Sequence, residues 1–455
     1  MGTLTRELSG RCDLLALAAT FPQRYPGLLE SAVRGAHARW DILFAFPRDA
    51  LILHPDGRVR DVQGNDRGGH FLEALDRAHA ACRSAQREAR NLPFTGGWLL
   101  YLGYELAEEI EPSLRLPRGP HPDMPLGLAL RCPAAILVDR ECARTLLVVE
   151  DERHADLLDA MQRDLESVRG DPPKCDALPH PLEIAEDDPA RFLSGVARIH
   201  DYLRAGHTFQ VNLSRQWRAR YMDPPNAASL YASLRAANPA PFAGLLQYGG
   251  SAIASSSPER LLEIRAGVAQ TRPIAGTRPR VPGDDDTMRI RELLAHAKER
   301  AEHVMLIDLE RNDLGRICAP GSVVVDEMMV VESYAHVHHI VSNVRGRVRH
   351  EVTPGQAIAA VFPGGTITGC PKVRCMEIIA ELENVPRGPY TGALGYLCNN
   401  GDLDLNILIR TLHLHGNEVT FRAGAGIVAD SDAQHELEET RAKARGMLRA
   451  LRAEA

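Results

Sequence analysis

Residues 134–149 read AAILVDRECARTLLVV, and this stretch carries the pattern that decides the fold class. Two apolar runs, Ala134–Val138 and Thr145–Val149, are separated by a short polar segment. Runs of this length that are rich in aliphatic and β-branched residues are typical of strands. A short polar connection between them is typical of antiparallel neighbours. The stretch therefore indicates strands in hairpin-like succession.

Outward from this stretch, the same pattern recurs. Further β-like runs lie at Trp40–Phe46 and Trp98–Leu102, and Gly69–Arg90 is a helical stretch. Strand signals that follow one another, instead of alternating strictly with helices, disfavour a doubly wound parallel sheet. We therefore predict an α+β fold with large, mixed, mainly antiparallel β-sheets flanked by helices.

One segment divides the chain of 455 residues. Residues 169–189, RGDPPKCDALPHPLEIAEDDP, are dense in proline and acid and have little apolar periodicity, which is typical of a linker. We expect an N-terminal subdomain over 1–168, a linker over 169–189 and a second domain over 190–455. Beyond the linker, apolar residues at helical spacing from Phe192 to Leu203 predict a helix, and 207–220 predicts a strand.

Composition excludes several classes of function. Lys and Arg number 53 and Asp and Glu 60, so the net charge of −7 offers no general attraction to nucleic acid or to an anionic membrane. No apolar run approaches the ~18 residues that span a bilayer. The nine cysteines lack zinc-binding spacing, so we expect reduced thiols in a cytoplasmic protein. Neither a Gly-x-Gly-x-x-Gly nor a P-loop pattern occurs, which disfavours common modes of nucleotide binding.

Two expected helices each carry a pair of glutamates three residues apart. The pairs are Glu299 with Glu302, and Glu436 with Glu439. Residues at i and i+3 share a helix face, so two such helices would supply the oxygen ligands that Mg²⁺ prefers. The same spacing also fits solvent-exposed acidic faces paired with neighbouring lysine and arginine, and spacing does not decide between the two.

Two glycine-rich stretches are suited to an anion. PGGTITGCPKVRCMEIIAEL (363–382) runs from a turn into a helix, with Thr366 and Thr368 as hydroxyl donors beside open backbone amides and with Lys372, one of only four lysines, just after them. RAGAGIVADSD (422–432) contains Gly424 and Gly426, where the missing side chains would let a ligand approach the backbone. Ordinary connections between strand and helix look the same, so both interpretations stay open.

Three further features could serve either structure or chemistry. Arg410 stands in an apolar strand-like run, LNILIRTLHL, and must meet an internal acid or the carboxylate of a ligand. Tyr390, in PYTGALGYL, offers a hydroxyl. The histidines of SYAHVHHIVSNV, among them His339, fit a general acid or base and equally a hydrogen-bonded core histidine.

Taken together, these segments resemble the chorismate-utilising enzymes. The resemblance follows the chain in order through the motifs LLES (28–31), FTGGWLLYLGYELAEEIE (94–111), FQVNLS (209–214), SSPERLL, RPIAGTRPR, DLERNDLGRI, VHHIVS, FPGGTITGCPKVRCMEII and AGAGIVADSD. It implies the α+β fold of that family, with two intergrown subdomains. FQVNLS, NPAPFAGLLQ, VHHIVS and FPGGTITG resemble the aminodeoxychorismate synthase component I branch, whereas Ala275 in RPIAGT is typical of anthranilate synthase component I.

The resemblance also implies roles for individual residues. It makes Glu302 and Glu439 ligands of Mg²⁺, with Glu299 and Glu436 beside them. Tyr390 and Arg410 would hold the enolpyruvyl carboxylate of chorismate. The amides from Gly424 to Gly426, with Thr366 and Lys443, would complete the anion cradle, and Glu259 and His339 would transfer protons at the ring.

The implied reaction replaces the 4-hydroxyl of chorismate by ammonia, giving 4-amino-4-deoxychorismate for p-aminobenzoate and folate. The alternative is anthranilate synthesis with release of pyruvate; a subunit that only binds chorismate or tryptophan is a third interpretation. No cysteine stands in the Gly-x-Cys-x-Gly setting of a glutaminase, so a separate glutamine amidotransferase partner is implied. Ser31 of LLES matches a tryptophan pocket of the family, which implies that tryptophan binds there.

Overall fold

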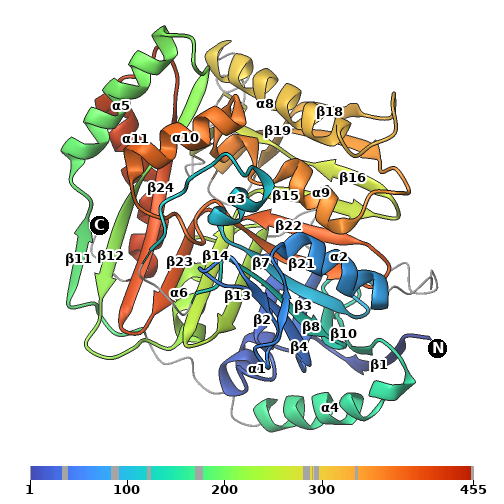
Figure 1. The fold of residues 1–455 in the computed structure, drawn as a ribbon. Coiled ribbons are helices and arrows are strands. Elements are labelled where there is room, and N and C mark those ends of the chain that lie inside the picture. Colours follow the sequence, from blue (N-terminus) through green and yellow to red (C-terminus); the bar gives the residue numbers. More distant parts are fainter. Residues whose placement is uncertain are drawn as a thin grey trace.

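The computed structural model describes residues 2–32, 39–82, 92–119, 124–169, 178–279, 287–288, 291, 297–333 and 337–451. Within some of these ranges only the backbone is described, at 169, 275–279, 297–299, 333 and 337–339. The described residues form two large sheets with helices on their outer faces (Figure 1).

The first sheet has twelve strands. In spatial order they are β1 (Leu4–Ser9), β10 (Arg144–Val149), β9 (Ala134–Asp139), β3 (Trp40–Ala45), β2 (Gly27–Glu30), β13 (Phe242–Tyr248), β14 (Ser251–Ser257), β23 (Thr411–His415), β24 (Glu418–Ile427), β12 (Gln210–Arg220) and β11 (Glu183–Glu186), with β20 (Gly369–Cys370) also paired to β12. Neighbouring strands run antiparallel.

The second sheet also has twelve strands. Their order is β17 (Ile274–Pro279), β19 (Val337–Arg347), β16 (Val268–Thr271), β15 (Arg260–Arg265), β22 (Leu403–Ile407), β21 (Ala393–Cys398), β7 (Gly97–Leu102), β8 (Gly127–Cys132), β4 (Asp49–Leu53), β5 (Val59–Arg60) and β6 (Asp66–Gly68), with β18 (Val324–Ser333) paired to β19. These pairings are antiparallel as well.

The helices vary in length from one turn to five. They are α1 (Leu14–Thr20), α2 (Phe71–Cys82), α3 (Ala107–Ile110), α4 (Asp156–Arg169), α5 (Pro189–Arg204), α6 (Ala227–Ala237), α8 (Ala297–Gly315), α9 (Pro354–Val361), α10 (Lys372–Glu383) and α11 (Ala433–Ala450), with short 3₁₀ turns η1 (Tyr104–Leu106), η2 (Glu152–His154) and η3 (Gly365–Ile367).

The core has three main layers of apolar side chains. Phe44 of β3, Leu99 of β7 and Leu137 of β9 belong to a cluster between the two sheets. A second cluster joins the outer face of the first sheet to α1, α4, α6 and α11. A third joins the outer face of the second sheet to α2, α8 and α9. The architecture is therefore helices, sheet, sheet, helices, as expected when each sheet buries both faces.

The predicted fold class and most predicted elements are confirmed. β9 and β10 pair antiparallel, with Val149 opposite Ala134. The helix predicted beyond the linker is α5, where the Asp188 side chain accepts from the amide of Ala190 and Pro189 occupies the first turn. The strand predicted over 207–220 is β12, which begins three residues later. Of the helix predicted over 69–90, α2 ends at Cys82, and 83–91 lie outside the described residues.

The predicted linker contains a strand. Within 178–189, β11 pairs with the end of β12, and Glu183 lies opposite Arg220. Because β11 is an edge strand with mostly exposed side chains, it lacks the apolar alternation by which a strand is recognised from sequence. On either side of 169–189 the chain supplies strands to both sheets, as β2 with β13 and β7 with β21 show, so the two expected subdomains are intergrown.

The helices that carry the predicted acidic pairs are present. α8 carries Glu299 and Glu302, and α11 carries Glu436 and Glu439. Figure 1 shows α5 and α11 beside β12 and β24 on one side of the molecule, and α8 beside β18 and β19 on the other. Among the described residues, no helix is both long and apolar enough to cross a membrane.

Candidate active site

The candidate site is built on the paired strands β12 and β24. Gly424 lies opposite Ser214, and Gly426 lies opposite Asn212. A Cβ atom on Gly424 would stand 2.8 Å from the Tyr390 hydroxyl and 2.7 Å from Asn212 Oδ1, and one on Gly426 would collide with the Gln210 amide. A side chain at 424 would also press on the backbone carbonyl of Leu213 at 2.8 Å, so glycine is required there, whereas at 426 the Gln210 side chain would have to move. We call this surface of β24, with the side chains facing it, the glycine cradle.

Lys443 and Glu439 of α11 border the glycine cradle. Lys443 Nζ donates to the carbonyl of Gly424 at 3.0 Å and pairs with Glu439 Oε1 at 2.6 Å. Residues at i and i+4 share a helix face, so the sequence spacing brings this pair together. The lysine predicted for the anion cradle is thus at the cradle, already paired with an acid.

Glu259 lies in the turn between β14 and β15 and is 6% exposed. Burial raises the pKa of its carboxyl to about 7, while the Thr366 hydroxyl and the Lys443 charge act to lower that pKa. Thr366 Oγ1 is itself buried, without a well-formed hydrogen bond to any described residue. A carboxyl with this pKa exchanges protons near neutral pH, as a general acid or base requires.

Arg410 is not in a strand, contrary to the prediction. It lies in the connection between β22 and β23, where the chain crosses from one sheet to the other, and its φ is 54°. The apolar run is interrupted because the connecting backbone bends there. Burial lowers the pKa of the Arg410 guanidinium, and Tyr390 and Glu439 are the groups that act to raise it. The residue is half-buried, so its guanidinium can still meet an anion that enters the site.

Tyr390 reaches the cradle from the loop between α10 and β21. It is 7% exposed, and burial raises the pKa of its phenol, so the hydroxyl stays protonated and can donate. Tyr390, Arg410, Lys443 and Glu259, which are far apart in sequence, are therefore linked through contacts or charges around one strand.

The carboxylates of α11 form part of a candidate metal centre. His435, Glu436 and Glu439 each offer a ligand atom, and these atoms all lie within 4.8 Å of one another. Glu436 Oε1 accepts from Ser431 Oγ at 2.7 Å. Carboxylate oxygens are the donors that Mg²⁺ prefers, so Glu436 and Glu439 would suit that ion, whereas the His435 nitrogen would not be one of its usual ligands. Glu302 of α8 is half-buried, and the side chain of Glu299 lies outside the described residues.

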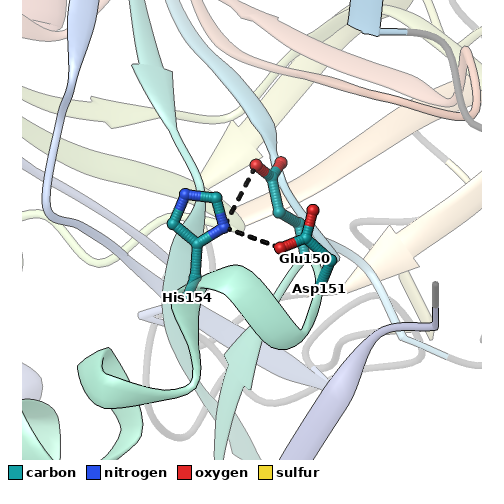
Figure 2. A group of neighbouring side chains, drawn as sticks. All are labelled: Glu150, Asp151 and His154. Carbon is teal, nitrogen blue, oxygen red and sulfur yellow. Dashed lines mark hydrogen bonds and ion pairs between the residues drawn. The ribbon is translucent and has the colours of Figure 1, made fainter.

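A second carboxylate and histidine group lies elsewhere, at the end of β10. His154 Nδ1 lies 3.0 Å from Asp151 Oδ1 and 3.6 Å from Glu150 Oε1 (Figure 2). Glu150 also pairs with Arg131, and Asp151 pairs with Arg153. Each carboxylate is thus paired with an arginine. The positive charge of these arginines would oppose the binding of a metal cation at this group.

A cavity of about 260 Å³ lies between the two sheets, away from the glycine cradle. Ser31, which is 3% exposed, lines it together with Trp40, Phe242 and Tyr396. The wall also carries charged side chains, among them Arg260. A pocket with apolar faces and a few polar groups suits a small aromatic ligand. The binding of tryptophan at Ser31 stays a prediction.

Two predicted positions lie on paired strands whose side chains are not described. His339 of β19 pairs through its backbone with Thr277, and Ala275 of β17 pairs with Ile340. The role of His339 therefore stays a prediction, as does that of Glu299. His336 lies outside the described residues.

Sequence reasoning missed Glu310 of α8. It is 6% exposed, and burial raises the pKa of its carboxyl to about 8, helped by Asp313 and opposed by Lys372. Lys372 pairs with Asp313 at 2.7 Å, so it serves an internal ion pair. Glu310 lies one helical turn from Leu306 and from Leu314. An acid within this apolar stripe of the helix is the sequence feature that could have indicated a buried carboxyl.

Comparison with known proteins gives a consistent picture. The family model described as chorismate binding enzyme matches residues 35–449. An anthranilate synthase component I-like protein of Synechocystis sp. is 42% identical over 425 residues, which cover 90% of this chain and 86% of that protein. An aminodeoxychorismate synthase of Streptomyces griseus is 40% identical over 395 residues, covering 84% of this chain and 53% of that protein.

A solved structure agrees with the architecture. The crystal structure of anthranilate synthase component I from Streptococcus pneumoniae matches with a TM-score of 0.81 and 33% identity, covering 91% of this chain and 93% of that one. Relatives with similar sequence identity to this chain thus carry the names of two enzymes, anthranilate synthase and aminodeoxychorismate synthase.

Proposed function

The chain belongs to the family of chorismate binding enzymes, and from that premise we propose that it is an aminodeoxychorismate synthase component I. In this reaction ammonia replaces the 4-hydroxyl of chorismate, and water leaves. The enolpyruvyl group stays on the ring.

The observation that carries the choice of product is the position of Asn212. It belongs to FQVNLS, one of the segments that resemble the aminodeoxychorismate branch, and its Oδ1 faces Gly424 in the cradle. This oxygen is buried without a hydrogen-bond partner among the described residues, so it can accept from a bound ligand. Thr366, from a second such segment, lies beside Glu259.

The residues of the chain would divide the work as follows. Tyr390 and Arg410 bind the enolpyruvyl carboxylate, which fixes the ring without touching the reacting carbon. Glu259 gives a proton to the leaving hydroxyl, for which a pKa of about 7 is well matched. His339 would be the second proton-transfer group. With a methyl group at position 275, no amine at that position can form an adduct with the ring.

Magnesium is part of the proposal. Glu302, Glu439 and Glu436, with Glu299, would hold the ion, and bound Mg²⁺ would withdraw charge from the ring carboxylate of chorismate. A glutamine amidotransferase subunit would supply the ammonia. The purified chain should then use ammonium and be inert with glutamine until that partner is added; turnover of glutamine by the chain alone would contradict this.

Anthranilate synthesis is the second candidate. Ala275, which is typical of the anthranilate branch, favours it, and several relatives carry that name. The test is the mass spectrum of the product formed from chorismate, Mg²⁺ and ammonium. We expect a product that keeps the enolpyruvyl group, with pyruvate released only after a lyase is added. Anthranilate and pyruvate without the lyase would overturn the proposal in favour of this candidate.

A further inference from the structure

The loop that carries Tyr390 is anchored by a buried guanidinium. Arg387 is 4% exposed, and a guanidinium has five N–H groups. The donors find five acceptors: Nε and Nη2 donate to the two oxygens of Glu383 at 3.0 and 2.7 Å, Nη2 to Asn212 O at 2.8 Å, and Nη1 to Ile367 O at 3.1 Å and Thr391 Oγ1 at 3.3 Å. Every donor of this side chain is therefore used.

These acceptors belong to different walls of the glycine cradle. Asn212 supplies the side-chain oxygen that faces Gly424. Ile367 directly follows Thr366, and Thr391 directly follows Tyr390. The planar Arg387 side chain thus connects β12, the turn at 365–367 and the loop over 384–392 that carries Tyr390, which we call the tyrosine loop.

Further contacts hold the tyrosine loop itself. The guanidinium carbon of Arg387 lies 5.4 Å from the centre of the Tyr390 ring and 5.0 Å from that of Tyr104. Glu105 accepts from the backbone amides of Arg387 at 2.7 Å and Gly388 at 3.1 Å. Both the ring and the backbone around Tyr390 are therefore fixed by this arginine and its neighbours.

The charge of the Glu383 carboxylate, which binds Arg387, is balanced by two arginines. Glu383 is 4% exposed and receives Arg387 together with Arg422, whose Nη2 lies 3.0 Å from Glu383 Oε2. Burial acts to raise the pKa of Glu383, but the two guanidiniums outweigh it and lower that pKa. A buried carboxylate with two arginine partners stays ionised and keeps its geometry.

We infer that Arg387 is a positioning residue that sets Tyr390 against the glycine cradle and so determines how tightly a carboxylate of the substrate is held. This inference rests on the proposed function, because it takes Tyr390 as a contact of chorismate. Lysine at position 387 would keep the charge but has three donors on one nitrogen, which cannot satisfy acceptors spread over three walls.

The test is equilibrium binding of chorismate to the full chain with Mg²⁺ and without ammonia. Arg387→Lys should weaken binding about 10-fold or more, since bidentate and stacked arginines are poorly replaced by lysine. Tyr390→Phe should weaken binding in the wild type but add little in the Arg387→Lys background, because the tyrosine is already displaced there. Binding by Arg387→Lys equal to that of the wild type, or additive effects of the two changes, would overturn the inference.

Arg215→Lys is the matched control. Arg215 is 2% exposed, pairs with Glu186 and lies over the Trp217 ring, on the face of β12 opposite to Ser214. Its replacement should lower stability but leave chorismate affinity unchanged; an equal loss of affinity would show that any buried arginine has this effect and would overturn the inference.

A milder variant covers the case in which Arg387→Lys does not fold. Thr391→Val removes one acceptor of Arg387 at nearly constant volume and should weaken chorismate binding about 2-fold to 5-fold, as expected for one lost hydrogen bond. Unchanged affinity in this variant would overturn the inference. A wild type that binds no chorismate would instead overturn the proposed function, so the two failures are distinguishable.

Discussion

The molecule contains two groups of a histidine with two carboxylates, and they differ in their surroundings. At the end of β10, Glu150 and Asp151 beside His154 pair with Arg131 and Arg153 (Figure 2). On α11, Glu439 beside His435 and Glu436 pairs with Lys443, which also reaches the glycine cradle. Both donor sets contain ion-paired carboxylates, but the first lies among arginines at the end of a strand, whereas the lysine of the second also reaches the candidate ligand site. The comparison teaches that the neighbours of an acidic group decide its role.

The largest expected effect comes from removing one negative charge from the group on α11 formed by His435, Glu436 and Glu439. Glu439→Gln should lower ammonia-dependent turnover of chorismate about 100-fold, because a ligand charge leaves a site for a hard cation. The measurement is kcat/KM as a function of Mg²⁺ concentration.

Glu150→Gln is the matched control for this change, and it should retain normal turnover and Mg²⁺ dependence. Normal activity in Glu439→Gln would remove the functional difference between the two groups. So would an equal loss of activity in both variants.

A second prediction compares two carboxyl groups with shifted pKa values. Burial raises the pKa of Glu259 to about 7, whereas the hydrogen bond from Arg153 lowers that of Asp151. If protonated Glu259 is the acid, kcat/KM for chorismate at a constant concentration of free ammonia should fall as the pH rises through about 7. Glu259→Gln should lose this dependence together with about 100-fold in rate.

Asp151→Asn serves as the control for that profile and should leave it unchanged. A Glu259→Gln variant that keeps the wild-type descent near pH 7 would show that another group is responsible.

The smallest expected effect concerns stability. Glu150→Gln leaves the half-buried Arg131 with a neutral partner, so the free energy of unfolding should fall by about 1–2 kcal/mol. Denaturant unfolding measures this change. An unchanged free energy of unfolding would mean that the β10 group is not the stabilising network described above.

The elements of the fold that could be predicted are those that depend on local patterns in the sequence. The hairpin at 134–149, the amphipathic helix from Phe192 and the glutamate pairs of α11 follow from repeats of two or of three to four residues, which backbone geometry imposes on any chain. The resemblance in sequence added Tyr390, Arg410 and Glu259 as predicted site residues. The edge strand β11 was not predicted, because its side chains are mostly exposed and leave no apolar pattern in the sequence.

The sequence by itself determined the class of fold, the helices that bear the acidic pairs and the motifs of the chorismate family. Only the tertiary structure decided that Arg410 stands at a crossing between two sheets, that Glu150 is neutralised by Arg131, and that Arg387 reaches Asn212, Ile367 and Thr391. The physical reason is that these contacts join residues far apart in the chain. Such contacts form when whole sheets pack together and bury their polar groups in pairs, and no local repeat in the sequence encodes which groups will meet.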